Sequence, residues 1–342
     1  MSAASDSQVT VETRYDKDGS INALQGKTVA VLGYGSQGHA HAQNLRDSGV
    51  EVIVANRRES DNGRLAAEHG FDPLPVDEAV RRADLVIMTL PDEVQPEVYE
   101  KLIGPNLKPG SVLGATHGFN VHFKTIVAPD HIDVVMVAPK GPGHTVRSEF
   151  ERGGGVPCLL AVDQDASGDA EAIAMAWAIG IGGGRAGVLT TTFKDECETD
   201  LFGEQTVLCG GLSALIKTAF DVLVEAGYPP ELAYFEVCHE LKLIIDLIVR
   251  GGLNFMRHSV SNTAEFGDYH TGPKIINAET KETMKKVLAE IQSGQYARTL
   301  REDYGNDFKW FKDQKQQDRQ HGVEQIGLEL RRMMPWLKPV EV

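Results

Sequence analysis

Residues 28–45, TVAVLGYGSQGHAHAQNL, decide the fold. An apolar, β-branched run leads directly into a G-x-G-x-x-G turn and then into a helical pattern. In this context the glycines allow a tight turn and let backbone N–H groups approach a pyrophosphate at the helix N-terminus. The stretch therefore predicts a dinucleotide site made by Gly33, Tyr34, Gly35, Ser36, Gln37 and Gly38. A tight strand–helix turn without a ligand is the less favoured alternative.

The same rhythm of short strands and helices continues to about residue 188, and it predicts a parallel, doubly wound sheet covered on both faces. The expected strands are 28–32, 51–55, 85–90, 111–115, 134–138 and 157–162. Beyond residue 190 the apolar period becomes helical. The expected helices are 200–226, 230–250, 278–293 and 313–334. The fold class is thus α/β, with a Rossmann domain over 1–192 and an all-helical domain over 193–338.

Composition narrows the function class. The 342 residues carry a formal net charge of -15, which argues against nucleic acid and anionic membrane surfaces as partners. The four cysteines show no disulfide framework, which indicates thiols in a reducing compartment. We identify 243–249 as the longest apolar stretch, and it is too short to span a bilayer. The N-terminus lacks the features of a signal or transit peptide, so we expect a cytoplasmic protein.

The loop after the second expected strand, ANRRESDN, bears on cofactor choice. Dinucleotide folds commonly place an acid here for the ribose hydroxyls of NAD, or cations for the 2′-phosphate of NADP. Arg57, Arg58 and Ser60 suit the phosphate, whereas Glu59 and Asp61 repel it. The residues of this loop that we expect to contact the cofactor are Arg57, Ser60, Asp61 and Asn62.

Other loops follow strand ends that share the ligand crevice of a doubly wound sheet. In LPDEVQ the expected cofactor contacts are Asp92, Glu93, Val94 and Gln95, and in PKGPGH the expected contact is Gly143. His117, in THGFN, and Lys140 should then fall near the nicotinamide end. A His or Lys in a loop is ordinarily just solvated. Only their position at the crevice favours a functional role for these two residues.

Four carboxylates form two i,i+4 pairs, Asp200 with Glu204 and Glu236 with Glu240. Residues four apart lie on one helix face, so each pair can aim at a common point. The surrounding segments are apolar, and buried unpaired carboxylates need cations beside them. Oxygen ligands without His or Cys favour Mg²⁺ or Mn²⁺, so the pairs predict a buried metal site. Surface acids that fall at this spacing by chance are the alternative. Asp195, Glu196 and Glu198 are interpreted as favourable charges near a helix N-terminus.

Taken together, these motifs resemble those of ketol-acid reductoisomerase, in the short form with one helical domain. The resemblance covers nearly the whole chain and rests on GYGSQGHA, HGFN, APKGPGHTVR, ETDLFGEQ, HELKLIIDL and SVSNTAEFG, in family order. It implies Mg²⁺-dependent alkyl migration in 2-acetolactate or 2-aceto-2-hydroxybutyrate, followed by hydride transfer from NAD(P)H. The products are dihydroxy acids of valine, leucine and isoleucine synthesis.

The resemblance also implies residue roles. Asp200 would bridge two Mg²⁺ ions, Glu204 would bind one, and Glu236 and Glu240 of a partner subunit would complete the ligand shell of the second ion. Ser261 would hold the substrate, His117 would be an active-site residue with Lys140 close by, and Glu240 would relay a proton or serve as a ligand only. The resemblance further implies a homodimer with a shared active site and a knotted helical domain. It leaves open whether the protein is a dimer or a dodecamer.

The loop after the second strand departs from the family pattern, because Asp61 and Asn62 stand where NADPH-using members carry small hydroxyl residues. We therefore expect NADH to be accepted, alone or beside NADPH. Two other functions compete with this one. A metal-independent 3-hydroxy acid dehydrogenase would also join a Rossmann domain to helices, but it leaves the carboxylate pairs unexplained. A non-catalytic dinucleotide sensor would not need every ligand position to keep its acid.

Overall fold

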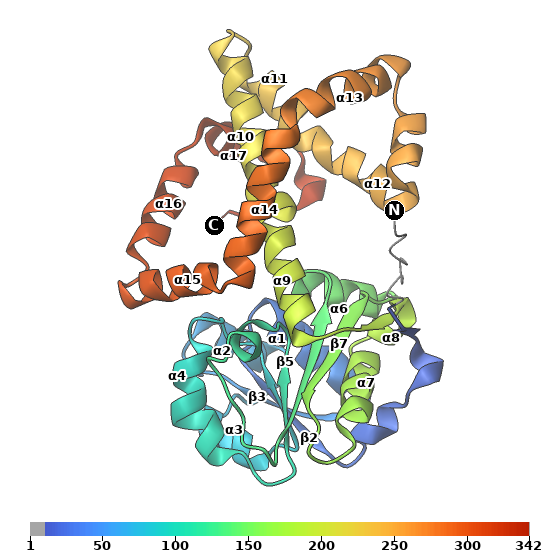
Figure 1. Cartoon of the computed structure of the whole chain (residues 1–342), viewed down its shortest axis with the longest axis vertical. Coiled ribbons are helices and arrows are strands. Elements are labelled where there is room, and N and C mark those ends of the chain that lie inside the picture. The colour runs from blue at the N-terminus through green and yellow to red at the C-terminus, as the bar shows by residue number, and fades with distance from the viewer. Residues whose placement is uncertain (1–10, 342) are drawn as a thin grey trace, which may run out of the picture. The chain divides into compact units, whose positions relative to one another are not determined.

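The structure is a computed structural model that describes residues 11–341. Its contacts divide the chain into a sheet unit, Met1–Thr199, and a helical unit, Asp200–Val342. Figure 1 shows strands only in the first and helices throughout the second. The expected α/β fold, with a Rossmann-like domain followed by a helical one, is confirmed.

Eight strands form the sheet, in the order β1-β8-β7-β6-β5-β4-β2-β3. Strands β2 to β6 are parallel, and the order reverses beside β2, where β3 lies on one side and β4 on the other. Ligands bind at such a reversal, beyond the carboxyl ends of the strands. The strands are β1 (Thr13–Arg14), β2 (Thr28–Leu32), β3 (Glu51–Ala55), β4 (Leu85–Met88), β5 (Val112–Ala115), β6 (Asp133–Pro139), β7 (Cys158–Gln164) and β8 (Val188–Thr190).

Alternate residues of the buried strands point to opposite faces of the sheet and pack into two separate cores. Val29 and Val31 of β2 pack with α1 and α7 on one face, whereas Ala30 and Leu32 pack with α3 on the other. The helices of this unit are α1 (Ser36–Asp47), α2 (Asp61–Glu68), α3 (Val76–Arg82), α4 (Gln95–Val98), α5 (Phe119–His122), α6 (Gly143–Glu151), α7 (Ala170–Gly180) and α8 (Gly183–Ala186), with short turns at Asp16–Asp18, Ile21–Leu24, Tyr99–Ile103 and Gly104–Asn106. The sheet is covered on both faces, as expected.

The expectation of an all-parallel sheet is wrong at one edge. Strand β7 runs antiparallel to β6, and β1 runs antiparallel to β8. A strand buried on both faces is a continuous apolar run in either direction, so its sequence does not show its orientation. Strands β1 and β8 were not predicted, because they have only two and three residues.

The helical unit begins within α9 (Phe193–Gly203), which continues through a π-helical turn, η5 (Glu204–Leu208), into α10 (Gly210–Glu225). The other elements are α11 (Pro230–Tyr234), the π-helical turn η6 (Phe235–His239), α12 (Glu240–Ser259), α13 (Asn262–Ile275), α14 (Ala278–Gln292), α15 (Gln295–Gly305), α16 (Lys309–Arg319), α17 (Gly322–Arg332) and the short turn η7 (Pro335–Leu337).

Several helix expectations need correction. Helices α13 and α15 were not predicted, and the expected helix 313–334 is broken at His321, whose extended backbone caps α17. The expected helix 230–250 extends further, because Gly252 adopts φ 78° and kinks α12, but helical bonding resumes to Ser259. Glycine tolerates this conformation because it has no Cβ.

The 33-residue helix Phe193–Glu225 contains an 18-residue window with a mean hydropathy of 1.8, so by length and composition it could cross a membrane. This corrects the expectation that residues 243–249 are the longest apolar stretch. One such helix is weak evidence for a membrane span, because the core helix of a soluble protein passes the same test.

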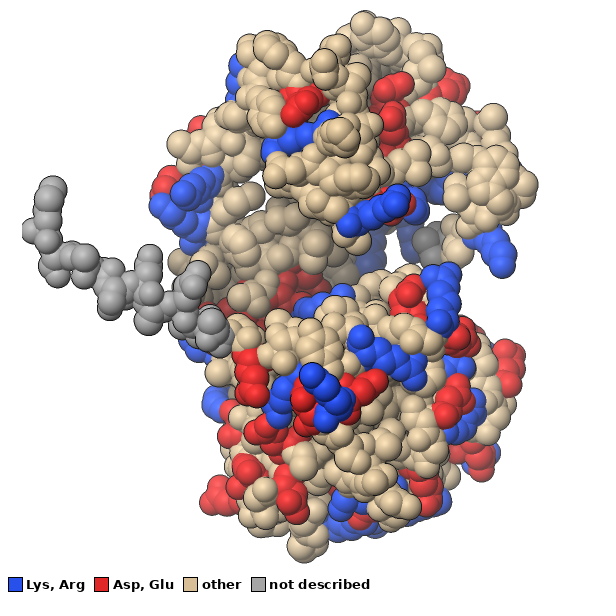
Figure 2. Space-filling view, turned by 90° about the vertical axis from the view of Figure 1, so that its right-hand side faces the viewer, with Lys and Arg blue, Asp and Glu red and all other residues tan. Residues whose placement is uncertain are grey.

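The helical unit buries little of its apolar surface within one chain. Its buried cluster contains Phe220, Ala233, Tyr234, Val323 and Leu330. By contrast, Val249 is 82% exposed and Phe266 is 70% exposed. In Figure 2 the helical unit shows mainly neutral surface, whereas cations and anions are interspersed over the sheet unit.

Candidate active site

The glycine-rich turn has the geometry of a dinucleotide site. Gly33 adopts φ 99°, and a Cβ on Gly38 would lie 2.3 Å from the Gly33 carbonyl oxygen, so both positions require glycine. A Cβ on Gly35 would meet nothing within 4 Å, which leaves space at the N-terminus of α1. These are the three roles of the motif: the tight turn, the approach to the pyrophosphate, and the close packing of helix on strand.

The turn is fastened to the loop that follows β6. Gln37 Nε2 donates to the Gly141 carbonyl (2.9 Å), and Gly143 N–H donates to Ser36 Oγ (3.1 Å). A Cβ on Gly143 would lie 1.5 Å from the Ser36 carbonyl oxygen, so this close approach requires glycine. Two of the loops predicted to contact the cofactor therefore lie in direct contact.

Tyr34 lies differently from its neighbours. The residue is 1% exposed and its hydroxyl bonds His69 Nδ1 (3.0 Å), so its side chain does not face a ligand. Burial raises the pKa of Tyr34 to about 12, which keeps the phenol neutral. The ring supports the turn from beneath.

The loop after β3 holds its charges in ion pairs. Asp61 bonds Arg64 (2.9 Å), and Arg58 bonds Asp72 (2.7 Å), all on the surface. Ser60 caps α2 by accepting a hydrogen bond from Gly63 N–H (3.1 Å). Arg57 is exposed in the loop, and Asn62 is exposed in the first turn of α2. Asp61 is thus exposed in the first turn of α2.

The loop after β4 is bound to the loop after β5. Asn120 Nδ2 donates to the Asp92 carbonyl (2.9 Å) and to Gln95 Oε1 (3.1 Å). Gln95 is buried and also donates to the Leu90 carbonyl (2.7 Å), so its side chain serves the loop itself. Asp92, Glu93 and Val94 form the bend at the carboxyl end of β4, next to the glycine-rich turn after β2.

His117 and Lys140, which the sequence placed at one end of the cofactor, share a buried carboxylate. Glu196 accepts hydrogen bonds from Lys140 Nζ (3.0 Å) and Gly118 N–H (2.8 Å), and it bonds His117 Nδ1 (3.1 Å). Its side chain is 1% exposed. We call Glu196, His117 and Lys140 the buried triad.

The buried triad holds separated charges. Burial lowers the pKa of His117, but its hydrogen bonds to Cys197 and Glu196 outweigh burial and raise that pKa well above 6.5. Burial raises the pKa of Glu196, and the neighbouring His117 and Lys140 reverse the shift and bring it to about 2. At neutral pH the triad therefore contains an imidazolium, an ammonium and a carboxylate.

Of the acids before Asp200, Asp195 and Glu196 lie in the first turn of α9, where a negative charge is favourable, as expected. The burial of two of the three acids was not predicted. Asp195 is exposed, but Glu196 and Glu198 are buried. Glu198 bonds Lys194 (2.9 Å) and His122 (3.3 Å). The sequence contained a signal for Glu196, because it precedes Asp200 by the same four residues that separate Asp200 from Glu204.

Both predicted carboxylate pairs lie in the helical unit, and each lies at a π-helical turn. Glu204 begins η5, while Glu236 lies within η6 and Glu240 follows it. The expected burial is wrong for the single chain, because Asp200 is half-buried and the other three are exposed. Among residues 11–341, no three of these acids bring carboxylate oxygens within 4.8 Å of one another.

Ser261 lies at the N-terminus of α13, where its Oγ accepts a hydrogen bond from Ala264 N–H (3.2 Å). A serine hydroxyl has two acceptor sites and one donor, so this cap leaves the O–H able to donate. The residue is exposed. It could therefore donate to an anionic ligand that also meets the positive end of the helix.

The four cysteines are free thiols, as expected, but they are not all buried. Cys158 and Cys197 are buried, Cys238 is half-buried, and Cys209 is exposed.

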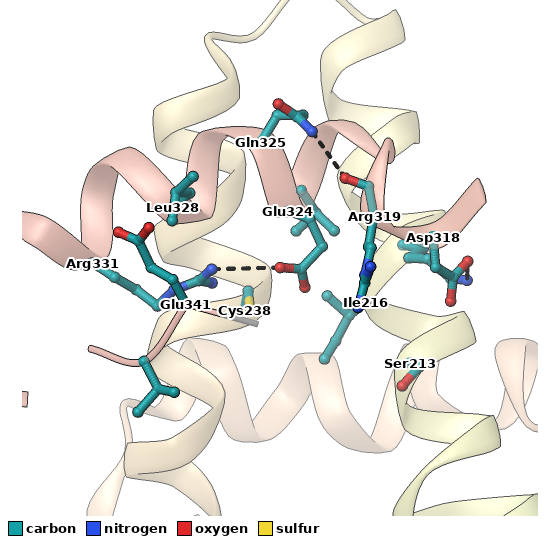
Figure 3. A pocket seen from close by; sticks show the side chains of 13 residues that line it. Ser213, Ile216, Cys238, Asp318, Arg319, Glu324, Gln325, Leu328, Arg331 and Glu341 are labelled. Carbon is teal, nitrogen blue, oxygen red and sulfur yellow. Dashed lines mark hydrogen bonds and ion pairs between the residues drawn. The ribbon is translucent and has the colours of Figure 1, made fainter. Parts of the chain in front are cut away.

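A cavity of about 510 Å³ in the helical unit is lined by Cys238 together with charged residues (Figure 3). Its charged side chains are engaged with one another, as in the pairs Lys217–Asp318 (2.8 Å) and Arg331–Glu324 (3.4 Å). Neither the carboxylate pairs nor Ser261 line it. It supports no part of the predicted chemistry.

Comparison with known proteins agrees with this geometry. Residues 23–187 match the family model described as acetohydroxy acid isomeroreductase, NADPH-binding domain. Residues 193–336 match the model described as ketol-acid reductoisomerase, C-terminal domain. An NADH-preferring ketol-acid reductoisomerase from an uncultured archaeon is 44% identical, with a TM-score of 0.93 over 94% of this chain and 99% of that one.

Two more distant structures share the fold alone. A putative oxidoreductase from Jannaschia sp. CCS1 is 17% identical, with a TM-score of 0.60 over 80% of this chain and 98% of that one. A semialdehyde dehydrogenase NAD-binding protein from Cupriavidus necator is 19% identical, with a TM-score of 0.59 over 78% and 99%. The two family matches together span most of the sequence. The chain therefore belongs to the ketol-acid reductoisomerases, the NAD(P)H-dependent oxidoreductases of branched-chain amino acid biosynthesis.

Proposed function

We propose that this chain carries out the Mg²⁺-dependent reaction of its family on 2-acetolactate and 2-aceto-2-hydroxybutyrate. Alkyl migration would come first, and reduction by the nicotinamide would follow. The observation that carries this proposal is the presence of both carboxylate pairs in a member of the family. A metal-independent 3-hydroxy acid dehydrogenase would have no use for them.

The donor chemistry fits two divalent cations. Asp200, Glu204, Glu236 and Glu240 offer only carboxylate oxygen, the ligand that Mg²⁺ prefers. When bound, two such cations supply electrostatic stabilisation to the two substrate oxygens whose charge changes during migration. Asp200 would be the bridging ligand, and Glu240 would act as a ligand or also relay a proton.

The buried triad would serve the reduction step. Glu196 keeps His117 protonated and holds Lys140 beside it, so two cations are presented where the loops after β5 and β6 end. A positioned imidazolium can donate a proton to an oxygen that gains charge as hydride arrives. The hydride itself is chemistry of the cofactor.

We further propose that NADH is accepted. Asp61 is suited to the ribose hydroxyls, and both Arg58 and Arg64 are bound by acids. The 44%-identical NADH-preferring relative supports this preference. Ser261 would orient the substrate by donating its hydroxyl hydrogen.

The active site would be shared between two copies of the chain in a cytoplasmic homodimer. Apolar side chains on α10, α12 and α13 are exposed in the single chain, and the carboxylate pairs do not converge within it. Glu236 and Glu240 would then come from the partner. Covering the apolar face would also remove the pairs from bulk water.

The test measures turnover of 2-acetolactate with and without Mg²⁺, with NADH and NADPH in parallel. Asp200→Asn should abolish both isomerisation and reduction, because a neutral amide cannot replace a carboxylate that bridges two cations. The matched control is Asp195→Asn, an exposed acid on the same helix, which should keep activity. Turnover without Mg²⁺, or full activity of Asp200→Asn, would favour the metal-independent dehydrogenase.

A further inference from the structure

The two carboxylate pairs share a backbone feature. Cys209 N–H donates to the Glu204 carbonyl (3.0 Å), and Glu240 N–H donates to the Phe235 carbonyl, five residues apart in each case. Within residues 11–341 only one other π-helical turn occurs, at Tyr99–Ile103. Such turns are rare, and they occur frequently at functional sites.

Two glycines make the first of these turns possible. A Cβ on Gly210 would lie 2.3 Å from the Gln205 carbonyl oxygen, and one on Gly211 would lie 2.0 Å from that of Thr206. In an α-helix each residue is bonded to the carbonyl four positions earlier. In this wider turn the carbonyl five positions earlier occupies the space of the side chain. Any L residue at Gly211 would have to change the turn.

The turn changes the direction in which the acids point. One extra residue rotates everything beyond it by roughly 100° relative to an uninterrupted helix. The packed face of α10 includes Ile216, Phe220 and Leu223. At 3.6 residues per turn, that face would lie roughly 150° from Asp200 and Glu204 without the turn, and roughly 50° from them with it.

We propose that η5, and the Gly210–Gly211 pair that permits it, position Asp200 and Glu204 for metal binding. The rotation of α10 is set by its packing on α11 and α17, so the length of the turn sets the direction of the acids upstream. The inference rests on the proposed metal-dependent function. The turn is a positioning element, since its glycines have no side chain to offer a ligand.

The first test compares Gly211→Ala with Gly305→Ala in the full-length protein without substrate. Gly305 ends α15, and a Cβ there would meet nothing within 4 Å. Mn²⁺ affinity is measured by calorimetry, and Mg²⁺ binding by the rise in melting temperature. Gly211→Ala should bind Mn²⁺ roughly 10- to 100-fold more weakly, as when the supports of metal ligands are lost. Gly305→Ala should bind as wild type, and a folded Gly211→Ala that also does so overturns the proposal.

A second variant guards against misfolding of Gly211→Ala. Deleting Val207, which is 55% exposed, should convert the π-helical turn into an α-turn. Gly211 would then follow Thr206 by four residues, so the deletion should restore the fold of Gly211→Ala while Mn²⁺ affinity stays low. A folded deletion variant with wild-type Mn²⁺ affinity overturns the proposal. Loss of Mn²⁺ binding in Asp200→Asn with retention in Gly211→Ala would reject the turn but keep the metal site.

Discussion

The sheet unit and the helical unit differ in how complete they are. In the sheet unit, strands are buried on both faces and the buried triad is fully assembled within one chain. In the helical unit, only a small cluster is buried, and among the described residues the carboxylate pairs, of which only Asp200 is half-buried, do not converge on one point. The sheet unit thus assembles its predicted site within a single chain, whereas the proposed metal site takes residues from a second copy.

The energetic scale supports this contrast. Fully burying a large apolar side chain contributes about 1.5–3 kcal/mol. Leu243, Val249, Leu253, Phe266 and Tyr269 are each more than half exposed. Covering them with a second copy would therefore favour association of the two copies.

Mixed dimers test this difference between the two units, and they should show the largest change in activity. Chains carrying Asp200→Asn and chains carrying Glu236→Gln should each be inactive alone. In a purified heterodimer, one of two symmetry-related sites would receive only intact ligands, so about half of wild-type activity should return. Activity is measured on heterodimers isolated with two affinity tags, and each variant paired with itself is the control. Verified heterodimers that stay inactive would place all four acids in one chain.

Replacement of Glu196 tests whether the sheet unit organises its half alone. Without this carboxylate the dominant remaining influence on His117 is burial, so the pKa of His117 should fall. The basic limb of the pH–rate profile should move to lower pH, and activity at neutral pH should drop roughly 100-fold if His117 acts as an acid.

The profile is measured for Glu196→Gln and for Glu198→Gln, which is equally deep on α9 but bonds His122 and Lys194. The second variant should leave the limb in place. A limb that moves equally in both would mean that the change reflects disturbed packing of α9.

Ser261→Ala should have an intermediate effect confined to the helical unit. A lost hydrogen bond to a charged group costs about 1.5–3 kcal/mol, which raises KM for 2-acetolactate roughly 10- to 100-fold. Loss of the cap should also reduce stability by about 1 kcal/mol. Asn277→Ala is the matched control, because Asn277 caps α14 in the same way. Asn277→Ala should lower stability without raising KM. Equal KM values in the two variants would mean that Ser261 only caps α13 and does not bind the substrate.

Asp61→Ser should give the smallest effect, within the sheet unit. Its carboxylate is 98% exposed and bonded to Arg64, so its repulsion of a 2′-phosphate is strongly screened. Exposed charges interact by about 0.2–1 kcal/mol, and the ratio of kcat/KM should move toward NADPH by about 1.4- to 5-fold. Asp77→Ser, which removes a comparable acid from α3, should leave the ratio unchanged. An unchanged ratio in Asp61→Ser would mean that this side chain does not meet the ribose.

The parts of the sheet that depend on residues adjacent in sequence were predictable. The glycine-rich turn and the bounds of β2 and β3 follow from residues adjacent in sequence. The orientation of β7 and the presence of β1 do not, because they depend on pairing between distant segments. The helix break at His321 was also missed. A capping residue between two helices can fall where a continuous helical pattern would place an exposed polar residue, so the pattern does not show the break.

The candidate site shows the same division. His117 and Lys140 were placed near each other by the rule for strand ends, but the carboxylate that joins them was not recognised. Glu196 stands in an acidic run, and only the packing of α9 shows that it is buried while Asp195 is exposed. The π-helical turns were likewise missed, because an i,i+4 spacing was counted on ideal helices.

The ion pairs of the loop after β3 carry a consequence for how cofactor preference is measured. The Arg58 and Asp72 side chains are 58% and 75% exposed, so dissolved ions reach them freely. At about 0.15 M ionic strength the Debye length is only about 8 Å, and it lengthens to about 30 Å at 0.01 M. Dilute buffer should therefore strengthen the hold of each acid on its arginine and also lengthen the reach of every charge toward a 2′-phosphate. The measured preference between NADH and NADPH should therefore depend on the ionic strength of the buffer as well as on the protein.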